Sequence, residues 1–158
     1  MQESVGKRMK NKLLVIFNSY GIMNQINKLH EETQELLDAI NEYELYYFNG
    51  NEQIEKYLRY HIEDEIADVL VVLQQFYVKY KLDININDKQ TKPNLKRLPL
   101  IVSLFCEYVP AHIYCLRYYR QLMEQLNNII WFYELDKKLI IEFMKYKINR
   151  QVHKLKEY

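Results

Sequence analysis

The chain has 158 residues, of which 49% are hydrophobic and 27% charged, with three glycines and three prolines. This length suits one compact domain, and so few glycines and prolines exclude a turn-rich all-β sandwich and a disordered or collagen-like chain. Lys and Arg total 22 against 21 Asp and Glu, so the formal net charge is +1. Without a broad basic field, we expect no nucleic-acid partner.

Cysteine use and hydropathy predict a cytoplasmic protein. The two cysteines, Cys106 and Cys115, are too few for a disulfide framework and fit a reducing compartment. The short apolar run Leu13–Phe17 follows four basic residues but is shorter than the apolar part of a signal peptide. No uncharged apolar stretch approaches the ~18 residues that cross a bilayer, so we expect no membrane partner.

Apolar residues recur with a helical period in the first half of the chain. The pattern predicts one helix from Ile22 to about Tyr47 and a second from about Glu52 to Tyr80. Asn49-Gly50-Asn51 interrupts the pattern as a helix end and turn would. The two helices are therefore expected to form an antiparallel hairpin folded at Gly50.

The second half of the chain predicts further helices after a polar loop over Asp83–Pro99. Pro110 is expected in the first turn of a helix that covers Ala111–Phe132. A last helix is expected over Asp136–Glu157, with a cluster of basic residues near its end. Together these elements predict an all-α fold, an antiparallel helical bundle built around the hairpin with additional C-terminal helices, in a single domain over residues 1–158.

Two acidic pairs distinguish the hairpin from an ordinary amphipathic one. Glu32 and Glu35 are three residues apart, as are Glu65 and Asp68, so each pair lies on one helix face. Both pairs lie roughly 75–150° to the same side of the apolar stripe of their helix, which brings them to one flank of an antiparallel hairpin. Glu32 and Asp68 are each 18 residues from Gly50, so the pairs also lie at the same height.

Four carboxylates at one place repel each other unless a cation compensates them. Oxygen-rich sites of this kind select Mg²⁺ or Mn²⁺ over zinc. The alternative at this point is that these carboxylates are solvated residues on the polar faces of amphipathic helices.

At these residues the sequence resembles the MazG-like, all-α nucleoside triphosphate pyrophosphohydrolases, which are related to the dimeric all-α dUTPases. Their signature is Glu-Glu-x-x-Glu on one helix and Glu-x-x-Asp on the next; here it reads Glu31-Glu32-Thr33-Gln34-Glu35 and Glu65-Ile66-Ala67-Asp68. The segment Lys145–Gln151 is similar to a Lys-x-x-Arg-Gln segment that closes many short members. Relative to compact members, the chain divides into an acidic hairpin (21–83), an inserted helical region (84–135) and a C-terminal basic helix (136–158).

The resemblance implies hydrolysis of a (deoxy)nucleoside triphosphate to the monophosphate and pyrophosphate, with Mg²⁺ or Mn²⁺ as cofactor and a homodimer or homotetramer as the assembly. The metal ligands that it implies are Glu32, Glu35, Glu65 and Asp68. Glu31 is expected to be a fifth ligand or a base, which makes five catalytic candidates. The residues expected at the substrate phosphates are Lys28, Lys147 and Arg150, and Asn24 is expected at the base or ribose.

Two other classes of function remain open on the sequence. One is a relative of the same fold that senses nucleotides or binds a protein partner without turnover. The other is a structural helical bundle whose carboxylates serve only as solvated surface. Base and sugar preference, and a choice among nucleotide-pool sanitation, dUTP removal and phage metabolism, do not follow from the motif.

Overall fold

The computed structural model describes residues 6–47, 50–86 and 89–156. Over these residues the structure is helical and contains no strand, which confirms the predicted all-α fold. None of the helices in this part of the chain is both long enough and apolar enough to pass through a bilayer. The elements in chain order are α1 (Lys7–Tyr20), α2 (Ile22–Tyr46), α3 (Glu52–Tyr80), α4 (Leu98–Tyr108), the short 3-10 helix η2 (Val109–Ala111), α5 (Cys115–Phe132) and α6 (Lys137–Lys156).

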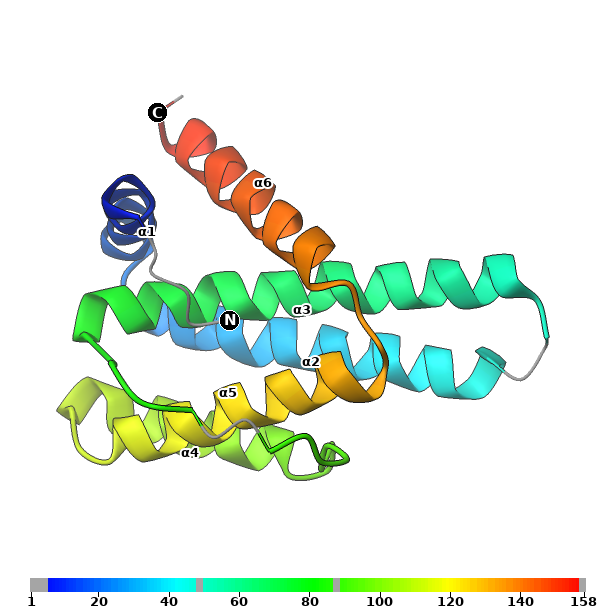
Figure 1. Ribbon diagram of the computed structural model, residues 1–158. Coiled ribbons are helices and arrows are strands. Elements are labelled where there is room, and N and C mark those ends of the chain that lie inside the picture. The colour runs from blue at the N-terminus through cyan, green and yellow to red at the C-terminus, as the bar shows by residue number, and fades with distance from the viewer. Residues whose placement is uncertain (1–5, 48–49, 87–88, 157–158) are drawn as a thin grey trace.

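The centre of the molecule is the antiparallel pair α2 and α3, which lie side by side along most of their length (Figure 1). Leu29 and Leu36 of α2 and Ile66 of α3 belong to the buried apolar core. These residues recur at helical spacing, so one face of each helix is removed from water while the other carries the charged residues. The predicted helices 22–47 and 52–80 agree with α2 and α3 in position and direction.

Local sequence explains where the central helices begin. The Asn51 side chain accepts hydrogen bonds from the backbone N–H groups of Gln53 and Ile54 and so caps the start of α3. Gly21 separates α1 from α2 with a backbone φ of 83°, a conformation that is costly for residues with a Cβ. Its N–H donates to the Phe17 carbonyl at 2.8 Å, which closes α1 as the chain turns.

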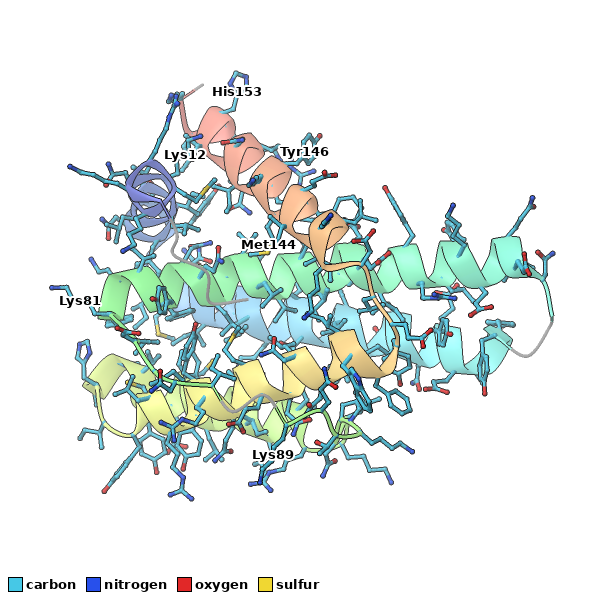
Figure 2. The ribbon with its side chains drawn as sticks, in the orientation of Figure 1. Lys12, Lys81, Lys89, Met144, Tyr146 and His153 are labelled. Atoms are coloured by element: carbon cyan, nitrogen blue, oxygen red, sulfur yellow. The ribbon has the colours of Figure 1, made fainter. Side chains whose placement is uncertain are left out.

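The other helices cover opposite sides of this pair. α4 and α5 form a layer on one side, while α6 crosses α3 on the other, with α1 beside the C-terminal half of α6 (Figure 1). Lys12 of α1 extends toward α6 in Figure 2, and its Nζ donates to Asn149 Oδ1 at 2.6 Å. The acidic flank of the hairpin lies on the side that α6 covers, since Lys147 of α6 contacts Asp64 and Asp68.

Three sequence expectations need correction. The helix expected over Ala111–Phe132 begins only at Cys115, because His112 and Tyr114 adopt left-handed φ values of 55° and 56° that end the preceding turn. Pro110 lies in η2 and not in an α-helix, and α4 already begins at Leu98, inside the expected loop. The sequence reading also missed helix α1.

Candidate metal centre

Three acidic side chains from the two central helices converge on the flank beneath α6. Glu32 of α2 and Glu65 and Asp68 of α3 each place one carboxylate oxygen within 4.8 Å of the others. We call these three residues the carboxylate triad. Their convergence follows from the helical spacing of Glu65 and Asp68 and from the fold at Gly50, which sets Glu32 and Asp68 at one height.

The other two acidic candidates lie at the edge of the triad. Glu35 is exposed and lies one turn along α2 from Glu32, close enough that its carboxylate contributes to raising the pKa of Glu32. Glu31 is exposed and is not part of the triad. The structure thus brings together three of the four expected metal ligands and leaves Glu35 beside them on the solvent side.

Burial makes the triad electrostatically costly. Loss of hydration raises the pKa of Glu32, Glu65 and Asp68 above the ordinary range for carboxyl groups, and repulsion from neighbouring carboxylates adds to the effect. The ammonium groups of Lys28 and Lys147 act in the opposite direction on Glu32 and Asp68, respectively. Nearby cations therefore offset only part of the cost.

Two triad oxygens have no hydrogen-bond partner among the described residues, namely Glu32 Oε2 and Glu65 Oε2, and both are buried. A buried carboxylate oxygen without a donor costs free energy, so such atoms call for a ligand. A divalent cation that prefers oxygen ligands is a suitable partner for carboxylate oxygens of this kind. The residues present therefore fit a Mg²⁺ or Mn²⁺ site.

Two lysines lie against the triad in different ways. Lys28 Nζ lies 2.8 Å from Glu32 Oε1, one helical turn away on α2, and the Lys28 side chain is partly exposed. Lys147 of α6 is only 7% exposed, and its Nζ lies 2.8 Å from Asp64 Oδ1 and 3.0 Å from Asp68 Oδ2. Lys147 therefore neutralises carboxylates, and its ammonium is already engaged on the acidic side of the site.

Lys147 occupies a core position of its helix, since α6 buries the face formed by Ile140, Met144, Lys147 and Ile148. Figure 2 shows Met144 on the side of α6 nearer α3 and Tyr146 on the outer side, in keeping with the burial of Met144 and the exposure of Tyr146. A lysine on the buried face needs a partner of opposite charge. Asp68 and Asp64 supply that charge, and Asp64 is not among the site residues expected from the sequence.

The start of α6 is fixed to α3 by a second buried acid. The Glu63 carboxylate accepts a hydrogen bond from the Asp136 backbone N–H, and the Asp136 side chain caps the N–H groups of Lys138 and Leu139. Burial raises the pKa of Glu63. This junction sets the position of α6 and hence that of Lys147 above the triad.

A cavity of about 280 Å³ adjoins the triad along α2, α3 and α6. The residues that line it include Asn24, Gln25, Lys28, Gln75, Arg150 and Lys154, and we call it the amide pocket. It gathers three residues that the sequence assigned to the substrate, Asn24, Lys28 and Arg150. The Arg150 guanidinium also lies 5.7 Å from the centre of the Tyr146 ring, and Asn24 Nδ2 donates to the Tyr20 carbonyl.

His61 extends the polar network at the edge of the site. Its Nε2 lies 3.3 Å from Glu65 Oε1, and its Nδ1 lies 3.7 Å from Glu42 Oε2. The spacing of His61 and Glu65, one helical turn apart, was the available sequence signal for this contact. No comparable signal points to Gln75, whose buried side chain lines the amide pocket.

A comparison of the sequence with protein-family models matches the part of the chain that contains the triad. Residues 22–91 match the family model described as MazG nucleotide pyrophosphohydrolase domain, a span that includes α2, α3 and the whole carboxylate triad. The match ends before α4, so it does not include α6 with Lys147 and Arg150. Searches of curated proteins and of solved structures find no significant match. The match over residues 22–91 supports the MazG-like superfamily as the family of this part of the chain.

Proposed function

We propose that the protein is a Mg²⁺-dependent nucleoside triphosphate pyrophosphohydrolase that converts a (deoxy)nucleoside triphosphate and water to the monophosphate and pyrophosphate. The observation that carries this proposal is the pair of buried triad oxygens without hydrogen-bond partners, beside a cavity lined by cations and amides. The family match supports nucleotide pyrophosphohydrolase chemistry at the level of the family. The proposed metal ligands are Glu32, Glu35, Glu65 and Asp68.

The residues of the site have separate tasks in this proposal. Glu32, Glu35, Glu65 and Asp68 would hold Mg²⁺, which would supply positive charge to the triphosphate and lower the pKa of a bound water. The water oxygen forms a bond to the α-phosphorus, the bond from that phosphorus to the bridging oxygen breaks, and pyrophosphate leaves with the electron pair. Glu31 or Glu35, both exposed at the edge of the triad, is positioned to accept the proton from water.

Positive charge for the phosphate chain comes from the amide pocket. Lys28 and Arg150 line it, and Arg presents a fork of donors that suits phosphate oxygens. Lys147 is the third expected phosphate ligand, and its ammonium contacts Asp64 and Asp68 in this structure. Because this ammonium already compensates two carboxylates, Lys28 and Arg150 are the first candidates for the phosphate oxygens.

Product analysis with labelled water tests the proposal directly. Incubation with each dNTP and Mg²⁺ in H₂¹⁸O is expected to release pyrophosphate, with the label in the monophosphate, because water attacks the α-phosphorus. Chelation of Mg²⁺ is expected to stop the reaction. Mass spectrometry of both products gives the position of the label.

Two results would contradict this proposal. Release of orthophosphate, or label in pyrophosphate, would show attack at another phosphorus. No turnover with any canonical or damaged nucleotide would remove the enzymatic function, and nucleotide-dependent thermal stabilisation would then favour the non-catalytic sensor.

The pH dependence of stability tests the metal site without turnover. Burial raises the pKa of Glu32, Glu65 and Asp68 in the folded protein. At pH values between the unfolded-state and the folded-state pKa values of these groups, the folded state therefore binds more protons than the unfolded state. The contribution of these groups to metal-free stability therefore falls as pH rises through that interval. Metal binding requires the ionised carboxylates, so the rise in Tm caused by saturating Mg²⁺ is expected to grow from about pH 5 to about pH 8.

Scanning calorimetry with and without MgCl₂ at each pH measures this difference. NaCl at matched ionic strength controls for screening of surface charge. A Mg²⁺-induced shift that stays constant across the pH range would argue against ligation by the triad.

A further inference from the structure

The amide pocket lies one to two helical turns from the carboxylate triad, away from the Gly50 turn. Along α2, Lys28 precedes Glu32 by one turn, and along α3, Gln75 follows Asp68 by two turns, a rise of about 10 Å. Lys28 contacts Glu32 and also lines the pocket. A ligand that reaches from the triad into the pocket therefore passes Lys28 before it meets Gln75.

Gln75 is the unusual residue in this pocket. Its side chain is 1% exposed, and its Oε1 is buried with no hydrogen-bond partner among the described residues. Buried amide oxygens in folded proteins nearly always have a donor. Gln75 therefore carries a hydrogen-bonding capacity that the described part of the chain leaves unused at the wall of a cavity.

The chemistry of an amide decides which part of a nucleotide suits it. A glutamine amide offers one acceptor and one NH₂ donor, in either orientation of the group. Phosphate oxygens only accept hydrogen bonds at neutral pH, so a phosphate leaves the amide oxygen unsatisfied. The edge of a nucleobase alternates donors and acceptors and can satisfy both ends, as in the pairing of Gln with adenine.

We propose that Gln75 is a specificity-determining residue that hydrogen-bonds the nucleobase edge in the amide pocket. This inference rests on the proposed function for its ligand class, since the triad and Lys28 would hold the phosphate chain. Arg150 and Lys154 form the α6 side of the same pocket. The base then lies against the neutral α3 wall at Gln75, where its edge can pair with the Gln75 amide, and Arg150 on the α6 wall remains with the phosphate chain.

Binding measurements on Gln75→Met, which keeps side-chain length but removes the amide, test this role. The probes are the α,β-methylene analogues of the four dNTPs and inorganic tripolyphosphate, each with Mg²⁺, in isothermal titration calorimetry. We expect Gln75→Met to bind the preferred analogue about tenfold more weakly, as for loss of one hydrogen bond, and to bind tripolyphosphate as the parent protein does. In Gln75→Met, the ratio between the affinity for the preferred base and the affinities for the other three is expected to fall by the same factor.

The matched control is Gln74→Met, because Gln74 is the adjacent glutamine on α3 and does not line the pocket. It is expected to leave all affinities unchanged. Arg150→Gln is expected to weaken tripolyphosphate and the nucleotide analogues alike, which shows that the phosphate probe reports on the site.

A second measurement needs no protein variant and covers the case in which Gln75→Met does not fold. The parent protein is expected to bind an analogue of the preferred nucleotide whose base donor is replaced by hydrogen or methyl about tenfold more weakly. In a folded Gln75→Met protein that difference disappears, because the two changes remove the same hydrogen bond.

Equal loss of nucleotide and tripolyphosphate affinity in Gln75→Met, no loss of either, or indifference of the parent protein to the base donor would overturn the inference. These outcomes are distinct from failure of the proposed function. If Gln75→Met hydrolyses nucleotides with the same order of preference among the bases as the parent protein, the role of Gln75 is rejected and the proposed hydrolase function stands. Base-dependent binding through Gln75 without turnover rejects the hydrolase alone.

Discussion

Replacement of Glu65 by Gln is expected to lower kcat/KM by about 10³-fold or more while leaving the fold intact. Glu65 supplies one of the two buried triad oxygens that lack a hydrogen-bond partner among the described residues, so its charge is central to the proposed cation site. The same charge is destabilising without metal, because burial and the neighbouring carboxylates both raise the pKa of Glu65. The metal-free variant is therefore expected to melt at the parent temperature or above it.

This opposition between activity and stability distinguishes a metal ligand from a structural residue. Steady-state kinetics and calorimetry on the same preparations measure both, and the Mg²⁺-induced rise in Tm is expected to be largely lost in Glu65→Gln. Glu107→Gln, at an exposed glutamate of α4, is the matched control and is expected to behave as the parent protein. Turnover within tenfold of the parent value would exclude Glu65 as a required ligand.

Lys147→Met is expected to lower the free energy of unfolding of the metal-free protein by about 2 kcal/mol near neutral pH, since removal of one partner leaves a poorly solvated acid without its counterion. The ammonium of Lys147 contacts Asp64 and Asp68, of which Asp68 is the more buried. Mg²⁺ is expected to recover much of the loss, because a cation at the triad compensates Asp68 directly. Denaturant unfolding with and without Mg²⁺ measures both quantities.

Lys145→Met, at an exposed lysine on the same helix, is the matched control and is expected to change stability by less than about 0.5 kcal/mol. A metal-free Lys147→Met protein as stable as the parent would mean that the contact with Asp68 contributes nothing. A phosphate role for Lys147 is a separate matter, and it would appear as a raised KM that persists at saturating Mg²⁺.

The sequence predicted the hairpin and the meeting of its acids because both depend on regular geometry. The helical period assigned Glu32, Glu65 and Asp68 to one flank, and equal distances from Gly50 set their height. Helix α1 was missed, although Leu13, Ile16 and Phe17 recur at helical spacing and are buried. The apolar run Leu13–Phe17 is too short to stand out in hydropathy, so only the spacing of these three residues indicates the helix.

The partners of Lys147 and the burial of Gln75 could not be predicted in the same way. Lys147 has the spacing of a core residue with Met144 and Ile148, but which acids lie opposite it depends on how α6 crosses α3. Gln75 follows a run of apolar residues on α3, and only packing against other helices removes its side chain from water. Crossing angles arise from the interlocking of many side chains, which no single motif encodes.

The attachment of α6 at several points has a consequence for how this site could diversify. The helix is held by Glu63 at its start, by Asp64 and Asp68 near its middle, and by Lys12 at Asn149. The width of the amide pocket therefore depends in part on Glu63 and Lys12, which belong neither to the triad nor to the pocket lining. Natural variation at these two anchors would re-tune substrate choice while the proposed metal-binding acids stay unchanged.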